Sequence, residues 1–152
     1  MEVIEKQITL DEIEILRKPL EKLHNYHNGK SKYFSGDYPR ITFEERIIGY
    51  RKNTKFGEYR IELLYESNTM NLIAFSIVYG KKVSGKIEVL YVDEGYRRNN
   101  LGTKLMDNAM NWFREKEIYD IELTVVYGNQ AVSFYEKFGF FPRSIIMGTK
   151  SL

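Results

Sequence analysis

The sequence predicts one mixed α/β domain, spanning residues 1–152, with a mostly antiparallel sheet and a parallel βαβ unit. A chain of 152 residues with 43% hydrophobic content suits a single ordinary domain. Strand-like segments follow one another with short turns between residues 59 and 93, as antiparallel strands do. A long amphipathic segment then separates two further strand-like segments, which is the order of a parallel crossover.

The N-terminal part is expected to form a strand followed by a helix. The segment "VIEKQITL" alternates loosely between apolar and polar residues, which indicates a strand. Thr9 and Glu12 have the spacing of a capping box and should begin a helix, which Pro19 should kink or split. The range His24 to Arg40 has no periodicity and is expected to be a loop.

The central part is expected to contain a second helix and three strands. A second capping box, Thr42 with Glu45, begins a helix that should end near Asn53. Alternation from Tyr59 to Leu63 indicates a half-buried strand. The turn "ESNTMN" precedes the apolar strand "LIAFSIVYG", and "KKVSG" leads into the strand "KIEVLYVD".

The C-terminal part is expected to hold a long helix, a strand, a short helix and a last strand or pair of strands. Leu101, Leu105, Ala109 and Phe113 form one stripe at helical spacing. The segment "IELTVVYG" indicates a strand, "NQAVSFYEKFGF" a short helix stopped by Gly139, and "FFPRSIIMGTK" the final strand or pair.

Composition excludes several classes of function. The formal net charge is only +2, so bulk charge gives no support for nucleic-acid or membrane binding. The absence of cysteine excludes disulfides, thiolate catalysis and cysteine-based metal sites. His24 and His27 lack a nearby third ligand, so we expect no metal. Without a signal-like or membrane-spanning segment, we expect a cytoplasmic protein.

The stretch "YVDEGYRRNNLGTKLM" predicts an anion site. A strand that enters a helix through a short loop directs the helix's free N–H groups at one point, and Arg97 and Arg98 add charge. The P-loop pattern is absent, and Gly102 alone does not make a dinucleotide-binding motif.

This stretch resembles the acetyl-CoA loop [Q/R]-x-x-G-x-[G/A] of the GCN5-related N-acetyltransferase (GNAT) family. Arg97 takes the first position and Gly102 the last, while Asn100 replaces the first glycine. Asparagine is the best non-glycine residue for a positive φ, so the substitution is compatible with the loop.

A second element strengthens the resemblance, which is strongest from Ile87 to Pro142. The segment "NQAVSFYEKFGF" closely resembles the family's N-x-x-A-x-x-x-Y-E-K-x-G-F element. The matching residues are Asn129, Ala131, Tyr135, Glu136, Lys137, Gly139 and Phe140. The order of elements also matches, so the resemblance implies a GNAT-like fold with helices on both faces of the sheet.

The resemblance implies acetyl-CoA as cosubstrate, no metal, and a set of binding residues. Backbone groups of Leu90, Tyr91 and Val92 should pair with the pantetheine amides and polarise the thioester carbonyl. The remaining cofactor-binding residues are expected to be Arg97, Arg98, Asn99, Asn100, Leu101, Gly102, Thr103, Asn129, Ala131 and Tyr135.

Two side chains are candidates for proton transfer. Tyr135 occupies the family's general-acid position; its alternative role is that of a packing aromatic residue. Glu88 is the candidate general base, because an acid within an apolar strand needs a reason, and alternation places it on the same side as Leu90 and Val92. A solvated or cross-strand-paired acid is the alternative. Many relatives carry their acid at the position of Lys86, and Asp93 and Glu94 are further candidates.

The predicted function is acetyl transfer from acetyl-CoA to a primary amine by direct attack in a ternary complex. The alternatives are a noncatalytic acyl-CoA-binding sensor or regulatory module and, third, a nucleic-acid-binding domain. The acceptor, a small molecule or a protein amine, remains open because its pocket lies in the variable region His24 to Lys55. Aromatic faces there could hold a cationic or apolar acceptor, from Tyr26, Tyr33, Phe34 and Tyr38. Relatives often dimerise, so the resemblance also implies a homodimer.

Overall fold

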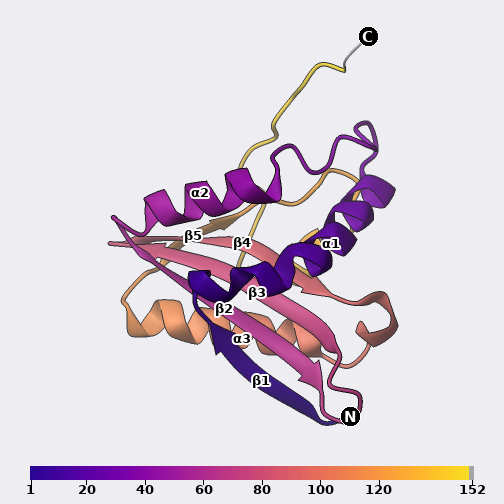
Figure 1. Cartoon of the computed structure of the whole chain (residues 1–152). Coiled ribbons are helices and arrows are strands. Elements are labelled where there is room, and N and C mark those ends of the chain that lie inside the picture. The colour runs from indigo at the N-terminus through magenta and orange to yellow at the C-terminus, as the bar shows by residue number, and fades with distance from the viewer. Residues whose placement is uncertain (151–152) are drawn as a thin grey trace. The chain divides into compact units, whose positions relative to one another are not determined.

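The structure, a computed structural model, describes residues 1–150, which fall into two units (Figure 1). The first unit comprises residues 1–17 and 42–124, and the second comprises residues 18–41 and 125–152. No helix among the described residues is long and apolar enough to cross a membrane.

The first unit contains one five-stranded sheet in the order β1-β2-β3-β4-β5 (Figure 1). Each of the first three neighbouring pairs is antiparallel, whereas β4 and β5 are parallel. The bounds are β1 Val3–Ile8, β2 Glu58–Glu66, β3 Leu72–Lys81, β4 Ser84–Val92 and β5 Asp120–Leu123. The predicted hairpins and the parallel βαβ unit are therefore confirmed.

Helices cover both faces of this sheet, as the sequence predicted. Helix α3, Leu101–Glu115, packs on one face through Leu105, Ala109 and Phe113, which are fully buried. Figure 1 shows α2, Phe43–Asn53, on the opposite face, where the ring of Tyr50 contacts the ring of Tyr59. The mixed α/β fold class is confirmed.

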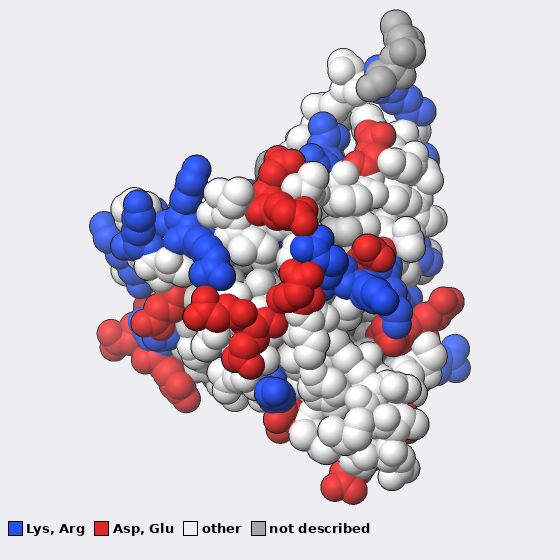
Figure 2. Space-filling model, viewed as in Figure 1, with Lys and Arg blue, Asp and Glu red and all other residues white. Residues whose placement is uncertain are grey.

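Both capping boxes begin a helical segment. The Thr42 hydroxyl accepts from Glu45 N–H at 3.0 Å, and Glu45 Oε1 accepts from Thr42 N–H at 3.4 Å. Thr9 N–H donates to Glu12 Oε1 at 3.2 Å before the 3₁₀ helix η1, Leu10–Leu16. Basic side chains gather at the end of α2 near β2 (Figure 2), where positive charge suits the helix dipole.

A β-bulge in β4 overturns the expected orientation of Glu88. Ile77 of β3 pairs with Val89 and Val78 pairs with Ile87, so Glu88 is an extra residue in the ladder. Alternation is interrupted at this point. Glu88 consequently lies on the face of α2, whereas Leu90 packs on the opposite face, against the core under α3.

The core under α3 also contains a buried charged pair. Glu62 is only 2% exposed, and its carboxylate accepts from Arg60 at 2.8 Å. Asn108 of α3 donates to both oxygens of the same carboxylate at 3.0 and 3.1 Å. These contacts stabilise the charge of Glu62 inside an otherwise apolar layer.

The second unit contains most of α1, Arg17–Lys30, and the short helix α4, Val132–Glu136. The predicted loop from His24 is wrong at its beginning, because helix α1 continues to Lys30. Pro19 lies in the first turn of α1, where its missing N–H costs no helical bond, and the 3₁₀ segment precedes it.

Asn28 fixes the loop that follows α1. Its Oδ1 atom accepts from the N–H groups of Gly36 and Tyr38, at 2.8 and 3.0 Å, and its Nδ2 donates to Tyr38 O at 2.8 Å. One helical side chain thus satisfies three backbone groups of a segment that lacks regular structure.

Of the two strands predicted near the C-terminus, the first is confirmed but shorter than expected and the second is wrong. The strand predicted in "IELTVVYG" ends at Leu123. The segment "FFPRSIIMGTK" forms no strand within the described residues. Its apolar side chains are largely exposed, at 72% for Ile145 and 88% for Ile146, so β-propensity has no partner strand to act on there.

Candidate active site

The loop between β4 and α3 has the backbone conformation that the motif requires. Asn100, the N-cap of α3, has φ 57° and ψ 25°, in the left-handed region. The expectation that asparagine serves here in place of glycine is thereby confirmed. The first intrahelical bond runs from Lys104 N–H to Asn100 O at 3.0 Å. The N–H groups of Leu101, Gly102 and Thr103 therefore have no acceptor within the helix.

Arg97 ties this loop to the end of β4. Its Nε donates to the carbonyl oxygen of Val92 at 2.9 Å, and its guanidinium carbon lies 5.6 Å from the centroid of the Tyr91 ring. Arg97 therefore positions the loop against the strand in addition to carrying charge.

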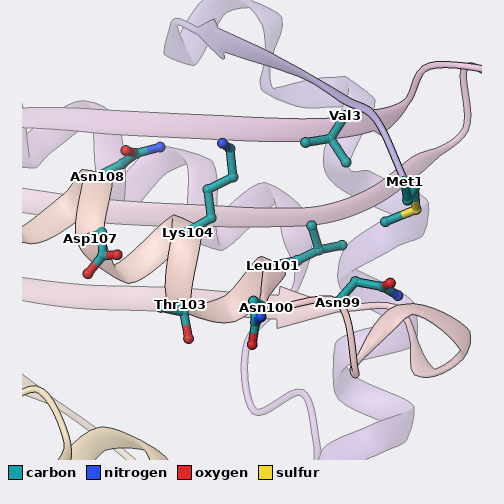
Figure 3. Close-up of a pocket in the computed structure, with 9 residues that line it drawn as sticks. All are labelled: Met1, Val3, Asn99, Asn100, Leu101, Thr103, Lys104, Asp107 and Asn108. Carbon is teal, nitrogen blue, oxygen red and sulfur yellow. The ribbon is translucent and has the colours of Figure 1, made fainter.

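A pocket of about 510 Å³ adjoins the loop (Figure 3). It brings together four of the predicted loop residues: Asn99, Asn100, Leu101 and Thr103. Its other lining residues are Met1, Val3, Lys104, Asp107 and Asn108. The sequence analysis did not include Lys104, whose ammonium nitrogen lies 3.7 Å from Glu5 Oε1. Its position in the first turn of the helix that follows Asn100 could have indicated that it lies beside the loop.

The end of β4 has an open edge. Pairing with β5 stops at Ile87, and in residues 1–150 no strand pairs with the later residues of β4 on that side. Asp93 N–H donates to Ile73 O of β3, so by antiparallel alternation the backbone groups of Leu90 and Val92 face the open edge. Those of Tyr91 point toward β3, which does not support the expected backbone role of Tyr91.

Glu88 lies beside Lys86 and near three tyrosines. Its Oε2 atom is 3.8 Å from Lys86 Nζ, and its side chain is 17% exposed. Burial, and to a smaller extent the Glu88 carboxylate, raise the pKa of Tyr50, Tyr59 and Tyr79. Asp93 and Glu94, the other candidate bases, lie at the turn after β4, where Asp93 O accepts from Tyr96 N–H at 2.9 Å.

Tyr135 lies in α4, in the second unit. Its half-buried ring packs edge-on against Phe134 with centroids 5.2 Å apart. Burial, with a contribution from Tyr26, raises the pKa of Tyr135 to about 12. The phenol is protonated at neutral pH, as an unperturbed tyrosine also is.

Asn129 and Ala131 form the start of α4. Asn129 Oδ1 accepts from Ala131 N–H at 3.1 Å, and Ala131 is the N-cap of the helix. Only Gln130 separates them, whereas the family element has two residues between its asparagine and alanine. The expected match of Asn129 is thus offset by one residue, and its side-chain oxygen caps the turn.

The predicted site residues fall into two groups. The first unit holds Glu88, Leu90 to Val92 and Arg97 to Thr103, and the second holds Asn129, Ala131 and Tyr135. Among the described residues there is no group of three or more His, Asp or Glu side chains that could hold a metal ion.

The fold and the loop define an acetyltransferase of the GNAT class. The model of the Acetyltransferase (GNAT) family matches residues 18–140, and the chain belongs to this family.

Solved structures support the same fold. A GCN5-related N-acetyltransferase from Ralstonia eutropha JMP134 has a TM-score of 0.74 at 16% identity, covering 98% of this chain and 99% of its own. A predicted acetyltransferase with acetyl-CoA from Clostridium acetobutylicum has a TM-score of 0.69 at 17% identity, covering 98% of this chain and 96% of its own. An aminoglycoside antibiotic 6'-N-acetyltransferase from Acinetobacter baumannii has 0.67 at 14%, covering 99% of both chains.

Proposed function

We propose that the protein transfers the acetyl group of acetyl-CoA to a primary amine by direct attack in a ternary complex. The left-handed Asn100 is the observation that carries this proposal, because it opens α3 so that the N–H groups of Leu101 to Thr103 have no helical acceptor. Such a helix terminus suits a pyrophosphate. Arg98, Asn99 and Arg97 complete the loop.

The open edge of β4 suits the remainder of the cosubstrate. The backbone groups of Leu90 and the N–H of Val92 can hydrogen-bond an extended amide chain as a neighbouring strand would, whereas the Val92 carbonyl oxygen already accepts from Arg97. A backbone N–H at this edge is the donor that stabilises negative charge on the thioester oxygen during attack. Bound acetyl-CoA supplies the acetyl group in activated, thioester form.

Two side chains of this chain handle the protons. Glu88 accepts a proton from the acceptor's ammonium group, which leaves the neutral amine that attacks the acetyl carbon. Tyr135 donates its phenolic proton to sulfur as the C–S bond breaks, the second proton of the attacking nitrogen passes to the resulting phenolate, and Glu88 releases its own proton to solvent. Asn129 and Ala131 set the start of the helix that carries Tyr135.

The test begins with melting temperatures in the presence of acetyl-CoA, ATP or NAD. Acetyl-CoA at about 100 times its Kd should add roughly 2.7 kcal/mol of stability, or about 5–10 °C for a domain of this size. Gly102→Val should lose this shift, because a β-branched side chain crowds the backbone against the pyrophosphate. An equal shift with ATP would reduce the loop to a general phosphate site.

Release of free CoA on addition of amines then separates an enzyme from a sensor. The proposed enzyme releases CoA only with an amine acceptor, whereas a sensor binds acetyl-CoA and releases none. Mass spectrometry of the product should show the mass of one added acetyl group. Cosubstrate binding without any product would establish the sensor.

A further inference from the structure

Two tyrosines and two lysines of the second unit form what we call the tyrosine–lysine cluster: Tyr33, Tyr127, Lys32 and Lys150. Lys32 Nζ lies 5.2 Å from the centroid of the Tyr33 ring and 5.9 Å from that of Tyr127. Lys150 Nζ lies 5.8 Å from the centroid of Tyr33. Two ammonium groups therefore lie within 6 Å of the centroid of one ring, that of Tyr33.

The cluster is accessible to a ligand. The two rings are stacked with an interplanar angle of 9° and centroids 6.1 Å apart. Tyr33 is 53% exposed and Tyr127 is 61% exposed. Solvent and a small ligand can thus reach the rings and the lysines that lie over them.

The backbone fixes the two halves of the cluster to each other. Lys32 N–H donates to Tyr127 O at 3.0 Å. Gly128 has φ +108°, and a Cβ atom there would lie 2.3 Å from Lys30 O. The segment after α1 and the segment before α4 therefore meet through main-chain contacts, which join the backbones of Lys32 and Tyr127 before any ligand arrives.

These charges are not neutralised within the described chain. In residues 1–150 neither Lys32 nor Lys150 forms an ion pair with a carboxylate. By contrast, Lys86, Lys104 and Lys116 of the first unit each lie within 4.0 Å of a glutamate oxygen.

The sequence of the second unit is strongly basic although the whole chain is nearly neutral. Residues 18–41 and 125–152 contain eight Lys or Arg and three Asp or Glu, a formal net charge of +5. The first unit contains 15 Lys or Arg and 18 Asp or Glu, a formal net charge of −3. The overall value of +2 thus conceals a basic unit around the cluster, which attracts anions.

We propose, as an extension of the proposed acetyl transfer, that the tyrosine–lysine cluster binds a carboxylate or phosphate group of the amine acceptor. A cationic acceptor would have to displace Lys32 and Lys150 from the rings and would meet a net charge of +5. An anionic group gains charge-assisted contact with the lysines without displacing them. The acceptor is then an acidic amine, and polyamines or other polycations are poor substrates.

Two matched pairs of amines test this proposal. O-phosphoethanolamine is compared with ethanolamine, and β-alanine with β-alaninamide, each in acetyl transfer with wild-type protein. In at least one pair the acidic amine should show a kcat/KM roughly 5- to 10-fold higher, and the preference should decrease with added salt. Equal values within both pairs, or a preference for the uncharged or cationic members, would overturn the proposal.

A double substitution assigns the preference to the cluster. In Lys32→Gln/Lys150→Gln the ratio of the two kcat/KM values should approach one, while Lys18→Gln, an exposed lysine outside the cluster, should leave the ratio unchanged. A higher KM for acetyl-CoA with an unchanged ratio would show that the cluster binds phosphates of CoA instead, and would also overturn the proposal.

Equilibrium binding keeps this inference separate from the proposed function. Calorimetric titration with O-phosphoethanolamine should show weaker binding to the double variant than to wild type. If the acidic amine binds in this manner but none of the four amines is acetylated, the anion site stands while its assignment to the amine acceptor is refuted. If it does not bind and no amine preference appears, the anion site is refuted.

Discussion

Individual residues in the site are held in states that suit their proposed tasks. Asn100 adopts a backbone conformation that most side chains avoid, and Tyr135 retains its proton far above neutral pH. The positive φ of Asn100 and the additional rise in the pKa of Tyr135 do not follow from residue type alone. The first depends on the loop that places Asn100 at the start of α3, and the second on the burial of a phenol within α4.

Replacing Tyr135 with phenylalanine tests its role as an acid. Tyr135→Phe should lower kcat by about 10²–10⁴, because the leaving sulfur loses its proton donor. Binding of acetyl-CoA, measured by titration, should change little since the ring is preserved. An unchanged kcat would leave Tyr135 as a packing residue, and Tyr119→Phe, at an exposed tyrosine outside the proposed sites, is the comparison for the loss of a tyrosine hydroxyl.

Substitutions at Asn100 measure the cost of the left-handed conformation. Asn100→Ala should lower the free energy of unfolding by about 1–2 kcal/mol, because a Cβ atom without a compensating polar group disfavours this region. Asn100→Gly should be tolerated. Urea unfolding of both variants provides the comparison, and equal stabilities would argue against strain at this position.

At the scale of elements, contact between β4 and α3 depends on a glycine. A Cβ atom on Gly85 would lie 2.5 Å from Cε1 of Phe113, whose side chain is fully buried. The strand carries Glu88 and the open edge, and the helix carries the N–H groups of the loop. Close packing of these two elements therefore determines the geometry of the first unit's half of the site.

Gly85→Ala should consequently destabilise the protein by about 1–3 kcal/mol through overpacking against Phe113. Gly49→Ala is the matched control. It lies within α2 with no atom near its Cβ position, and it should increase stability by roughly 0.5–1 kcal/mol. The melting temperatures of the two variants should shift in opposite directions from that of the wild type. Shifts of the same sign would contradict the packing argument.

Local sequence patterns predicted most elements because their signals are local. The capping box at Thr42 and the apolar stripe of α3 depend on residues within a few turns of each other. The bulge at Glu88 could not be foreseen, because it depends on how β3 pairs with β4. The extension of α1 to Lys30 was missed because Asn28 and its neighbours are weak helix formers whose structure depends on more distant contacts.

In the candidate site too, the parts that depend on local sequence were predictable and those that depend on distant contacts were not. The loop from Arg97 to Thr103 is contiguous, so its motif is visible in the sequence, and its conformation agrees with that motif. The tyrosine–lysine cluster joins residues about a hundred positions apart, so no local pattern announces it. A nearly neutral composition also concealed its charge.

At the scale of the whole molecule, many tyrosines share one response to alkaline pH. Burial and neighbouring acids raise the pKa of tyrosines in both units: Tyr50, Tyr59, Tyr65, Tyr79, Tyr91, Tyr96 and Tyr135. In the unfolded chain these phenols lose their protons near pH 10. The folded state retains them to higher pH.

The stability of the whole chain should therefore decrease above about pH 10. Below that value the unfolded phenols are also protonated and the raised pKa values contribute fully; above it, the unfolded state releases more protons and becomes favoured. Urea midpoints between pH 8 and 11 should fall, and Tyr59→Phe should reduce the slope. A flat profile would mean that the tyrosines ionise equally in both states.

The bulge in β4 makes the chain locally tolerant of a change in length. Residues up to Ile87 and from Val89 onward obey the strand alternation on either side of one inserted residue, Glu88. Loss of that residue would regularise the ladder and leave every core side chain on its own face of the sheet. An acidic group can thus be gained or lost at the edge of the site by a single-codon insertion or deletion, without rebuilding the hydrophobic core around it.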